Sequence, residues 1–384
     1  MSEAVIVDAI RTPIGRAAKG SLKDVRADDL AAVPLKALVE RNPGVDFSQT
    51  VDIMMGCGFQ MGEQGQNVGR QAGLLAGIDH HVPATSVNRF CASSLQTIRM
   101  AFHAIKAGEG DQYIAAGVEA VSRFPAHEPY SAHPGLDGSE GDPFDVYIPM
   151  GLTAENVAKR CNVSREAQDE WAVTSQSRAV AARDAGHFDA EITPVTLADG
   201  TQVTKDDGPR PGTTMEKLAE LKPAFDPENG TVTAGNACPL NDGAAAVLVM
   251  SEERAKELGL EPKVRIVASA VAAIRPEYMG LGPIPAVKAV LAQAGMSIDD
   301  IDVVELNEAF AAQVVPCLQE WGIDRDRVNP FGGAIALGHP FGMTGARIMT
   351  TLINDLQTLG GTYGLETMCV AGGMGQAMIV ERMS

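Results

Sequence analysis

Apolar residues recur with helical spacing in some segments of the chain and form short strand-like runs in others. One order of such segments occurs twice. Residues 31–38 carry apolar positions at helical spacing, and residues 51–56 form a short apolar run. Residues 285–291 and 301–306 repeat that order. Each pair predicts an amphipathic helix, a short loop and a buried strand. The chain is therefore predicted to contain two similar α/β halves.

Two later segments continue the repeat. Residues 87–90 (Val-Asn-Arg-Phe) resemble residues 328–331 (Val-Asn-Pro-Phe), and a helical pattern follows each. The first pattern ends at Gly108 and the second at Gly360, as glycine commonly ends a helix.

A third pair predicts a hairpin in each half. Residues 114–117 resemble residues 369–372, where the chain turns back at once into strand 376–380. In the first half the matching return strand, 245–250, comes much later. We therefore expect a lobe inserted into the first hairpin. The expected division is 1–118 with 242–268 for the first half, 119–241 for the inserted loop domain, and 269–384 for the second half.

The inserted segment contains a helix of its own. Ser164 is a plausible N-cap, because acids at 166, 169 and 170 follow it in the first turns. Insertions of this length are usually functional or disordered, and the helix argues against disorder. Since the two halves offer equivalent loop ends at a shared face, we expect the active site between them.

Composition narrows the class of protein. The chain has 384 residues, 45% of them hydrophobic, and a net charge of −18. Such an acidic surface argues against nucleic acid as a partner, and a polyanionic ligand would need a local basic region. No apolar run is long enough to span a membrane, and no signal segment begins the chain, so a cytoplasmic protein is expected.

The six cysteines do not predict a metal site. None of them forms a Cys-x-x-Cys pair, so no zinc site and no other metal are expected. Cys91 is the one whose position suggests chemistry, because it stands where a helix begins. Free N–H groups there favour a thiolate and lower the pKa of a thiol toward about 3.5–7.5. The alternative is a cysteine that simply packs beneath the helix.

Three more positions are candidates by their surroundings. His339 lies between glycine and proline in a glycine-rich loop, which indicates a side chain positioned by the backbone, although a solvated loop histidine is the alternative. Cys369 precedes small residues whose N–H groups can face a ligand, or which only make the turn. Asn307 and Glu308 end a buried strand, where a helix cap is equally consistent with the pattern.

Taken together, these segments resemble the motifs of thiolases. Residues 87–96 (VNRFCASSLQ) resemble the acyl-cysteine motif, and residues 307–312 (NEAFAA) the Asn-Glu-Ala-Phe motif. Residues 329–345 resemble the Gly-His-Pro signature, and residues 369–375 (CVAGGMG) the C-terminal cysteine motif. Segments 233–236 and 241–244 are also similar, so the resemblance covers nearly the whole chain in the family order.

The resemblance implies a fold, a chemistry and an assembly. The fold would have five layers, αβαβα, built from two pseudo-equivalent halves with an inserted loop domain. The reaction would be cleavage of 3-ketoacyl-CoA by CoA in two covalent half-reactions, with CoA as a substrate, no permanently bound cofactor and no metal. The protein would form homodimers or homotetramers.

The family's roles carry over residue by residue. Cys91 would be the nucleophile, His339 and Cys369 would exchange protons, and Asn307 would hold a water. The backbone N–H groups of Cys91 and Ala371 would form an oxyanion hole. The residues expected to contact CoA or the acyl chain are Met150, Arg210, Ala234, Cys238, Met279, Ala309 and Phe310.

Some positions depart from the family pattern. Ser94 replaces a usual glycine, Ala371 replaces a frequent glycine, and Cys238 replaces a serine, which weakens one expected CoA contact. Pro149 stands where acetoacetyl-CoA thiolases usually have histidine, and this favours the degradative enzymes of fatty acid β-oxidation. Residues 205–211 (KDDGPRP) favour them too.

Three alternatives remain. The first is a biosynthetic acetoacetyl-CoA thiolase, and the second is a ketoacyl synthase, against which the second cysteine, Cys369, argues. The third is a CoA-thioester binding protein without turnover, against which the complete set of four catalytic positions argues.

Overall fold

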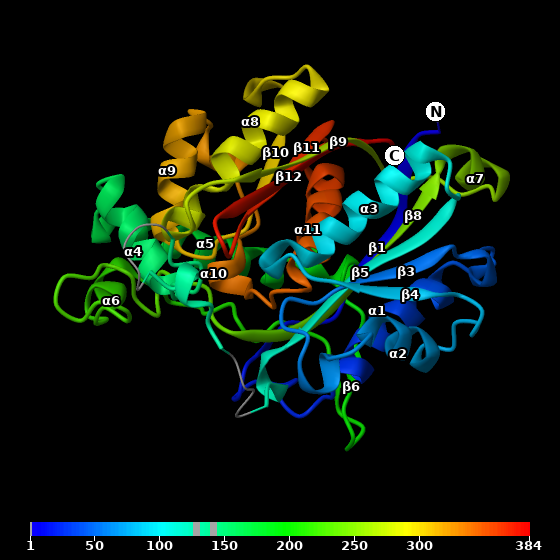
Figure 1. Cartoon of the computed structure of the whole chain (residues 1–384), viewed down its shortest axis with the longest axis horizontal. Coiled ribbons are helices and arrows are strands. Elements are labelled where there is room, and N and C mark those ends of the chain that lie inside the picture. Colours follow the sequence, from blue (N-terminus) through cyan, green and yellow to red (C-terminus); the bar gives the residue numbers. More distant parts are fainter. Residues whose placement is uncertain (1, 126–130, 139–143) are drawn as a thin grey trace.

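The computed structural model describes residues 2–125, 131–138 and 144–384. Within them, the main sheet has the strand order β10-β11-β12-β9-β1-β8-β5-β3-β4 (Figure 1). A short strand, β2 (Gly15–Arg16), pairs with β8. The other strands are β1 (Ala4–Arg11), β3 (Asp52–Gly56), β4 (Ala84–Val87), β5 (Gln112–Ala120), β8 (Asn241–Ser251), β9 (Val264–Ala273), β10 (Val303–Leu306), β11 (Tyr363–Val370) and β12 (Met374–Arg382).

The sheet consists of two similar groups of strands. In the first, β3 and β5 are parallel, and β5 pairs antiparallel with β8. In the second, β10 and β11 are parallel, and β11 pairs antiparallel with β12. Only two residue pairs, Val5 with Arg265 and Ile6 with Val264, join the groups through β1 and β9. The repeat predicted from the sequence is therefore present in the pairing.

Helices surround and separate the two groups. One face of the first group is covered by α1 and α2, and one face of the second by α8 and α9, each over its own apolar core. Between the groups lie α3 and α11, whose core takes side chains from strands of both halves (Figure 1). These are the predicted five layers. The helices are α1 (Ala27–Arg41), α2 (Val68–Leu75), α3 (Ser93–Ala107), α7 (Glu252–Glu257), α8 (Pro283–Ala294), α9 (Ala311–Trp321), α10 (Ala334–Leu337) and α11 (Thr344–Leu359).

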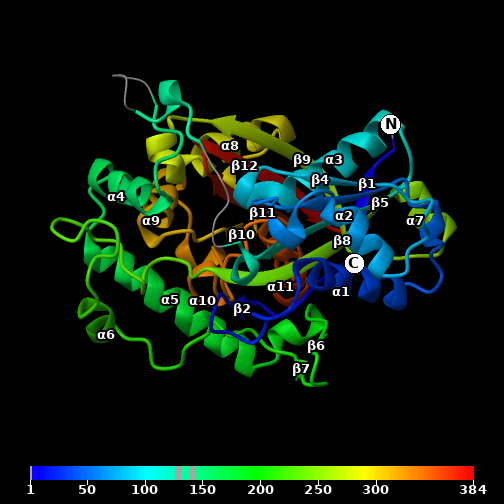
Figure 2. The same ribbon diagram turned by 60° about the horizontal axis from the view of Figure 1, so that its bottom comes forward.

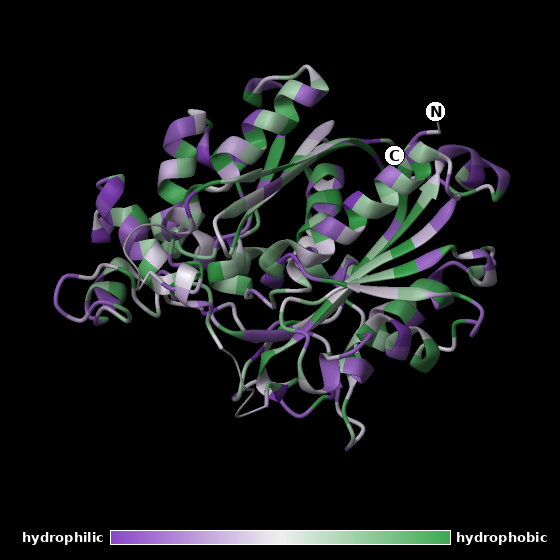
Figure 3. Cartoon of the chain, in the orientation of Figure 1, coloured by the Kyte–Doolittle hydropathy of each residue, from purple (hydrophilic) through white to green (hydrophobic). Residues whose placement is uncertain are grey.

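Burial follows the hydropathy of the sequence. The strands β1 and β8 are buried along their whole length, as strands covered on both faces must be. In Figure 3 the strands are mostly hydrophobic, whereas hydrophilic residues gather on the outer helices and loops. As predicted, α3 and α11 end at glycines, Gly108 and Gly360, both in the left-handed region.

The segment between β5 and β8 leaves the sheet. It contains α4 (Met150–Arg160), α5 (Arg165–Asp184), α6 (Met215–Ala219) and a small hairpin of β6 (Val195–Thr196) and β7 (Gln202–Val203). Ser164 caps α5, as predicted, by accepting a hydrogen bond from the N–H of Ala167. Figure 2 shows α4, α5 and α6 gathered at one end of the molecule, and α5 packs on α9 and α10.

A buried arginine ties this segment to the sheet. The guanidinium of Arg11, on β1, donates to both oxygens of Asp206 at 2.7 and 2.9 Å and to Glu191 at 2.9 Å. Asp206 also accepts from the N–H of Ile14. The two carboxylates satisfy a fully buried charge, so the attachment is strongly constrained in geometry.

The second half begins earlier than the boundary expected at 268/269. That boundary falls inside β9, and β9 pairs with β12 from Val264–Arg382 to Ala273–Met374. Pairing with β1 is limited to the two positions given above. The hydrogen bonds therefore assign the whole strand to the second half.

The two halves are in close backbone contact where α3 packs on α11. A Cβ added at Gly345 would lie 2.2 Å from the backbone N of Leu95, a distance that no real side chain adopts. Ser94 fills the neighbouring space, and its hydroxyl accepts the N–H of Ala346 at 2.8 Å. The serine that departs from the family pattern thus makes a hydrogen bond between the halves.

In the described part of the chain, no helix has both the length and the apolarity that crossing a bilayer requires.

Replacement of Gly345 by alanine should destabilise the fold. The new Cβ would force α3 and α11 apart, and such overpacking costs about 1–3 kcal/mol. Urea unfolding should show a lower midpoint. Gly44→Ala is the matched control, because a Cβ there meets nothing within 4 Å and the residue is not in the left-handed region, so its midpoint should stay close to that of the wild type. An equal midpoint for both variants would contradict the proposed close contact.

Candidate active site

Cys91 lies in a strained turn between β4 and α3. The turn is a 3₁₀ helix, Phe90–Ala92, and Phe90 has φ of 45°, which non-glycine residues rarely adopt. The side chain of Asn88 stabilises the turn by accepting the N–H of Phe90 at 2.8 Å. Cys91 itself is buried, so the turn holds its thiol in the interior between the halves.

The pKa of the Cys91 thiol is not lowered, contrary to the expectation from its position before a helix. Burial raises the pKa to about 12, even though the backbone N–H groups of Ala371 and of Cys91 itself face the sulfur and act to lower it. Desolvation of the thiolate outweighs the two N–H groups. The resting site therefore holds a neutral thiol, and the two groups expected to form the oxyanion hole converge on it.

Cys369 is the second thiol of the site. It is fully buried near the end of β11, where the hairpin to β12 turns through Gly372 and Gly373 with φ of 78° and 79°. Its pKa is raised well above the usual value by burial and then by Cys91 and two other thiols. Cys91 and Cys369 thus disfavour each other's charged form, so the site admits one thiolate at a time.

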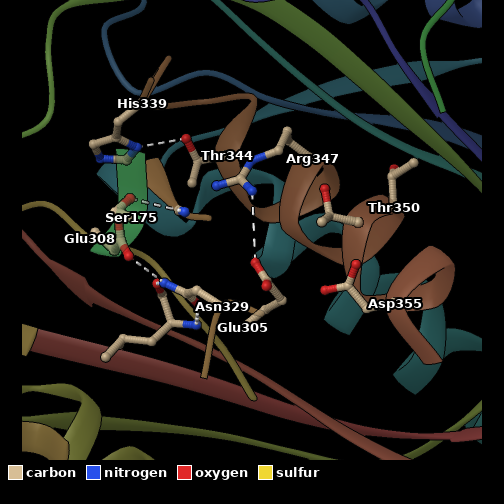
Figure 4. A network of polar contacts seen from close by, with 12 residues as sticks. Ser175, Glu305, Glu308, Asn329, His339, Thr344, Arg347, Thr350 and Asp355 are labelled. Atoms are coloured by element: carbon tan, nitrogen blue, oxygen red, sulfur yellow. Dashed lines mark hydrogen bonds and ion pairs between the residues drawn. The ribbon is translucent and has the colours of Figure 1, made fainter. Parts of the chain in front are cut away.

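His339 is a buried, neutral imidazole with a fixed tautomer. Burial and then Arg347 lower its pKa to about 3. Its Nδ1 lies 2.6 Å from the Oγ1 of Thr344, and that hydroxyl donates its own hydrogen to the carbonyl of Pro340 at 2.7 Å (Figure 4). The hydroxyl can therefore only accept from Nδ1–H, which leaves the lone pair on Nε2.

Asn307 lies at the Nε2 side of this ring. Its Nδ2 is 3.4 Å from Nε2 of His339, and its backbone N–H donates to the carbonyl of Thr367 on β11. The Oδ1 atom of Asn307 is buried and has no hydrogen-bond partner among the described residues. Such an orphaned acceptor fits a water or ligand donor, as the resemblance implied.

Glu308 holds the inserted segment to the loop that precedes His339. It is fully buried and accepts from Trp171 and Ser175 of α5 at 2.9 and 2.7 Å. From the other side it accepts from Asn329 at 2.8 Å and from the N–H of Ile335 at 3.0 Å (Figure 4). Asn307 and Glu308 therefore have different tasks, since one faces the site and the other supports it.

The apolar residues expected to line the substrate path gather around Cys369. Met279, Ala309 and Phe310 belong to one buried cluster with that cysteine, and Met150 packs against the cluster. Met279 comes from the 3₁₀ turn Pro276–Leu281 and Met150 from the start of α4. Three separate regions of the chain thus meet at the thiol.

The segment expected to contact CoA runs alongside these residues. The N–H of Cys238 donates to the carbonyl of Ala309 at 3.0 Å, and Ala234 is exposed four residues earlier. Burial and then Cys91 raise the pKa of the Cys238 thiol, and Cys238 in turn contributes to the raised pKa of Cys369, so a third thiol borders the site.

Arg210 is exposed, as a residue that binds a phosphate or adenine from solvent needs to be. Partial burial and then Arg16 lower its pKa, which places two cations near each other on an otherwise acidic protein. This pair is a local basic region of the kind that the net charge of −18 requires for a polyanionic ligand.

The side chains that could hold a metal ion lie outside the motifs described above. In the described ranges, a group of donor atoms suited to an ion is formed by Asp79, His80 and His81, all exposed in the loop between α2 and β4. None of them belongs to the motifs around Cys91, His339 or Cys369.

Three supporting residues were not identified from the sequence. Thr344 fixes the tautomer of His339, Arg347 lowers the pKa of that ring, and Glu119 binds loops from both halves. A signal existed for Glu119, a carboxylate inside the apolar run 114–120. Thr344 and Arg347 carry none, because polar residues at the start of a helix usually cap it or face solvent.

Replacement of Thr344 by valine should release the tautomer of His339. Valine has nearly the same shape and removes the acceptor of Nδ1–H, so long-range ¹⁵N–¹H NMR should show a mixture of tautomers in place of the Nδ1–H form alone. Thr344→Ser keeps the hydroxyl and should retain the single tautomer. A wild-type protein with the proton on Nε2 would show that the hydrogen-bond direction is wrong.

Comparison with known proteins agrees with this geometry. Residues 4–253 match the family model "Thiolase, N-terminal domain" and residues 260–382 match "Thiolase, C-terminal domain". The chain is 49% identical to the 3-ketoacyl-CoA thiolase of Serratia proteamaculans and 48% identical to the beta-ketoadipyl-CoA thiolase of Acinetobacter baylyi, in both cases over the whole of each chain.

A solved structure shows the same fold. The crystal structure of the Bacillus anthracis acetyl-CoA acetyltransferase superimposes with a TM-score of 0.91 at 39% identity, covering 100% of this chain and 99% of that one. The five-layer fold predicted from the sequence is thereby confirmed as the thiolase fold. With both family models matched across nearly its entire length, the chain belongs to the thiolase family of acyltransferases.

Proposed function

We propose that this thiolase cleaves 3-ketoacyl-CoA with CoA, giving acetyl-CoA and a shortened acyl-CoA, as in the degradation of fatty acids. The observation that carries the proposal is the pair of buried thiols, Cys91 and Cys369, each of which disfavours the charge of the other. One nucleophile and one acid held in a single apolar site suit cleavage of a carbon–carbon bond next to a thioester.

In the first half-reaction Cys91 attacks the C3 carbonyl of the substrate. Its proton passes to Nε2 of His339, which Thr344 keeps free to accept it. The N–H groups of Cys91 and Ala371 stabilise the C3 oxyanion, and one such donor contributes about 10²–10³ in rate. The C2–C3 bond then breaks, and Cys369 protonates C2, so that acetyl-CoA leaves and the acyl group stays on Cys91.

In the second half-reaction the roles of the thiols alternate. The Cys369 thiolate takes the proton of incoming CoA, because its raised pKa makes that thiolate a strong base. The CoA sulfur attacks the acyl group on Cys91, and the Cys91 sulfur leaves and recovers its proton from His339. A water on the orphaned Oδ1 of Asn307 would assist the enolate. CoA enters as a substrate, and its phosphates would lie near Arg210 and Arg16.

The acyl specificity is a finer proposal. Pro149 precedes α4 where the acetoacetyl-CoA enzymes have histidine, and it leaves the apolar Met150 to face the cluster around Cys369. This favours alkyl chains longer than acetoacetyl. Because relatives of equal identity are named beta-ketoadipyl-CoA thiolase, a chain with a distal carboxylate is the second candidate. Biosynthetic condensation is the third candidate.

We also propose that the protein forms a homodimer or homotetramer, which light scattering would measure.

Variants of the two cysteines should separate the half-reactions. Cys91→Ser should abolish labelling by radioactive acetyl-CoA, because the acyl acceptor is lost. Cys369→Ala should still be labelled but should not turn over, because no acid/base remains. Cys161→Ser is the control, since this half-buried thiol packs at the edge of the cluster around Cys369 but has no step assigned to it, and it should retain activity. Full activity of either of the first two variants would remove its assigned role.

The chain-length preference should follow the apolar lining. Burial of each CH₂ contributes about 0.8 kcal/mol, so kcat/KM for 3-ketohexanoyl-CoA should exceed that for acetoacetyl-CoA about tenfold. Thiolysis assays with these two substrates and β-ketoadipyl-CoA would measure it. A preference for acetoacetyl-CoA would favour the biosynthetic alternative, and a preference for β-ketoadipyl-CoA the dicarboxylic one. A folded protein that cleaves none of the three would contradict the proposed function.

A further inference from the structure

Glu119 is a fully buried carboxylate whose neighbours are backbone N–H groups from both halves. It is the penultimate residue of β5. Its Oε2 accepts the N–H of Gly58 at 2.9 Å and that of Gly342 at 2.8 Å. Its Oε1 accepts from the N–H of Phe59 at 3.2 Å and from the side chain of Gln64. The proposed reaction assigns no chemical step to this residue.

The hydrogen bond of Glu119 to Gly58 leads to Cys91, the proposed nucleophile. The carbonyl of Gly58 accepts from Nδ2 of Asn88 at 2.9 Å, and Oδ1 of Asn88 accepts from the N–H of Phe90 at 2.8 Å. Phe90 is the strained residue directly before Cys91. A chain of three hydrogen bonds therefore runs from the carboxylate of Glu119 to the turn that carries the thiol.

The hydrogen bond of Glu119 to Gly342 leads to His339, the proposed base. Gly342 is three residues after His339, in the loop that enters α11. Ring contacts run parallel to the hydrogen bonds, because Phe59 lies 5.5 Å from Phe341 and 6.3 Å from Phe90 between ring centroids. Phe341 in turn lies edge-on to the ring of His339 at 5.2 Å. The two loops thus meet at one carboxylate.

The approach of the loops leaves no space for other side chains. A Cβ at Gly342 would lie 2.3 Å from the carbonyl of Val118, and one at Gly58 would lie 2.8 Å from Oε2 of Glu119. Only glycine lets both backbones come close enough to donate to the same oxygen atom.

We propose that Glu119 is a positioning residue, which fixes the Cys91 turn and the His339 loop relative to each other by accepting backbone N–H groups from both. The expected effect on catalysis rests on the proposed function. The hydrogen bonds of Glu119 to both loops, which we call the clamp, do not depend on it. A single oxygen, Oε2, accepts from both halves through its two lone pairs, while Oε1 accepts from Phe59 and Gln64 of the first half.

Two electrostatic effects oppose each other at Glu119. Burial raises the pKa of Glu119 to about 7, and the N–H groups of Gly342 and Gly58, followed by Gln64, act against this shift by favouring the charged form. A charge is costly to bury, and these donors offset part of that cost.

Glu119→Met tests the clamp. Methionine keeps the length of the side chain but has no oxygen acceptor, whereas the amide oxygen of glutamine could replace Oε2 and still accept from Gly58 and Gly342. A displacement of about 1 Å between reacting groups can cost about 10²-fold, so kcat should fall about 10- to 100-fold with KM changed less than about threefold. Glu119→Asp keeps the charge but lacks the reach, and it should not restore kcat.

Asp8→Asn is the matched control. Asp8 is a buried carboxylate on β1 that accepts from Arg41 and Asn42 at the end of α1. Its replacement should leave kcat near the wild-type value. A kcat of Glu119→Met within threefold of wild type, or an equal loss in Asp8→Asn, would overturn the proposal.

Hydrogen exchange gives a readout that does not depend on the reaction. In Glu119→Met the amides of both Gly58–Phe59 and Gly342 should exchange faster than in the wild type, whereas they should be unchanged in Asp8→Asn. Unchanged exchange in either loop would overturn the clamp. A wild-type protein without thiolysis would overturn the proposed function alone, and exchange would still decide whether Glu119 binds both loops.

Discussion

The contact between α3 and α11 sets the geometry on which the site depends. Each helix belongs to a different half, and at Gly345 they approach until backbone meets backbone. A shared central layer of this kind brings together the loops that precede both helices. The Cys91 turn comes before α3 and the His339 loop before α11, so the close contact of these helices brings the two segments toward one junction.

Burial then decides the chemistry at that junction. Removal of water raises the pKa of the Cys91 and Cys369 thiols and lowers that of His339, which leaves neutral groups at rest. The thiols and the imidazole differ widely in pKa. A proton therefore passes from a thiol to the imidazole only when bound substrate offsets that difference. Thr344 and Asn307 orient the imidazole, and Glu308 and Glu119 hold the loops, so buried polar residues act here through position more than through charge transfer.

The inserted segment completes the site from outside the repeat. It is attached at Arg11 to the first half and at Glu308 to the second, through carboxylates in both cases. Met150 packs against the cluster that contains Cys369, and Cys238 binds the backbone of Ala309 in that cluster. Relatives of similar identity are named 3-ketoacyl-CoA thiolase and beta-ketoadipyl-CoA thiolase.

The sequence by itself determined the repeat, the insertion, the helix ends and the candidate residues Cys91, His339, Cys369 and Asn307. These depend on local periodicity and on short motifs, which neighbouring residues in the chain record. It placed the start of the second half too late, because only pairing with β12 shows to which half β9 belongs. It also gave the pKa of Cys91 the wrong direction, since a helix start is visible in the sequence and the depth of burial is not. The roles of Thr344, Arg347 and Glu119 were decided by the tertiary structure alone, because the folding of the loop before α11 brings His339 to Thr344 and Arg347, and the packing of the two halves brings Gly342 to Glu119.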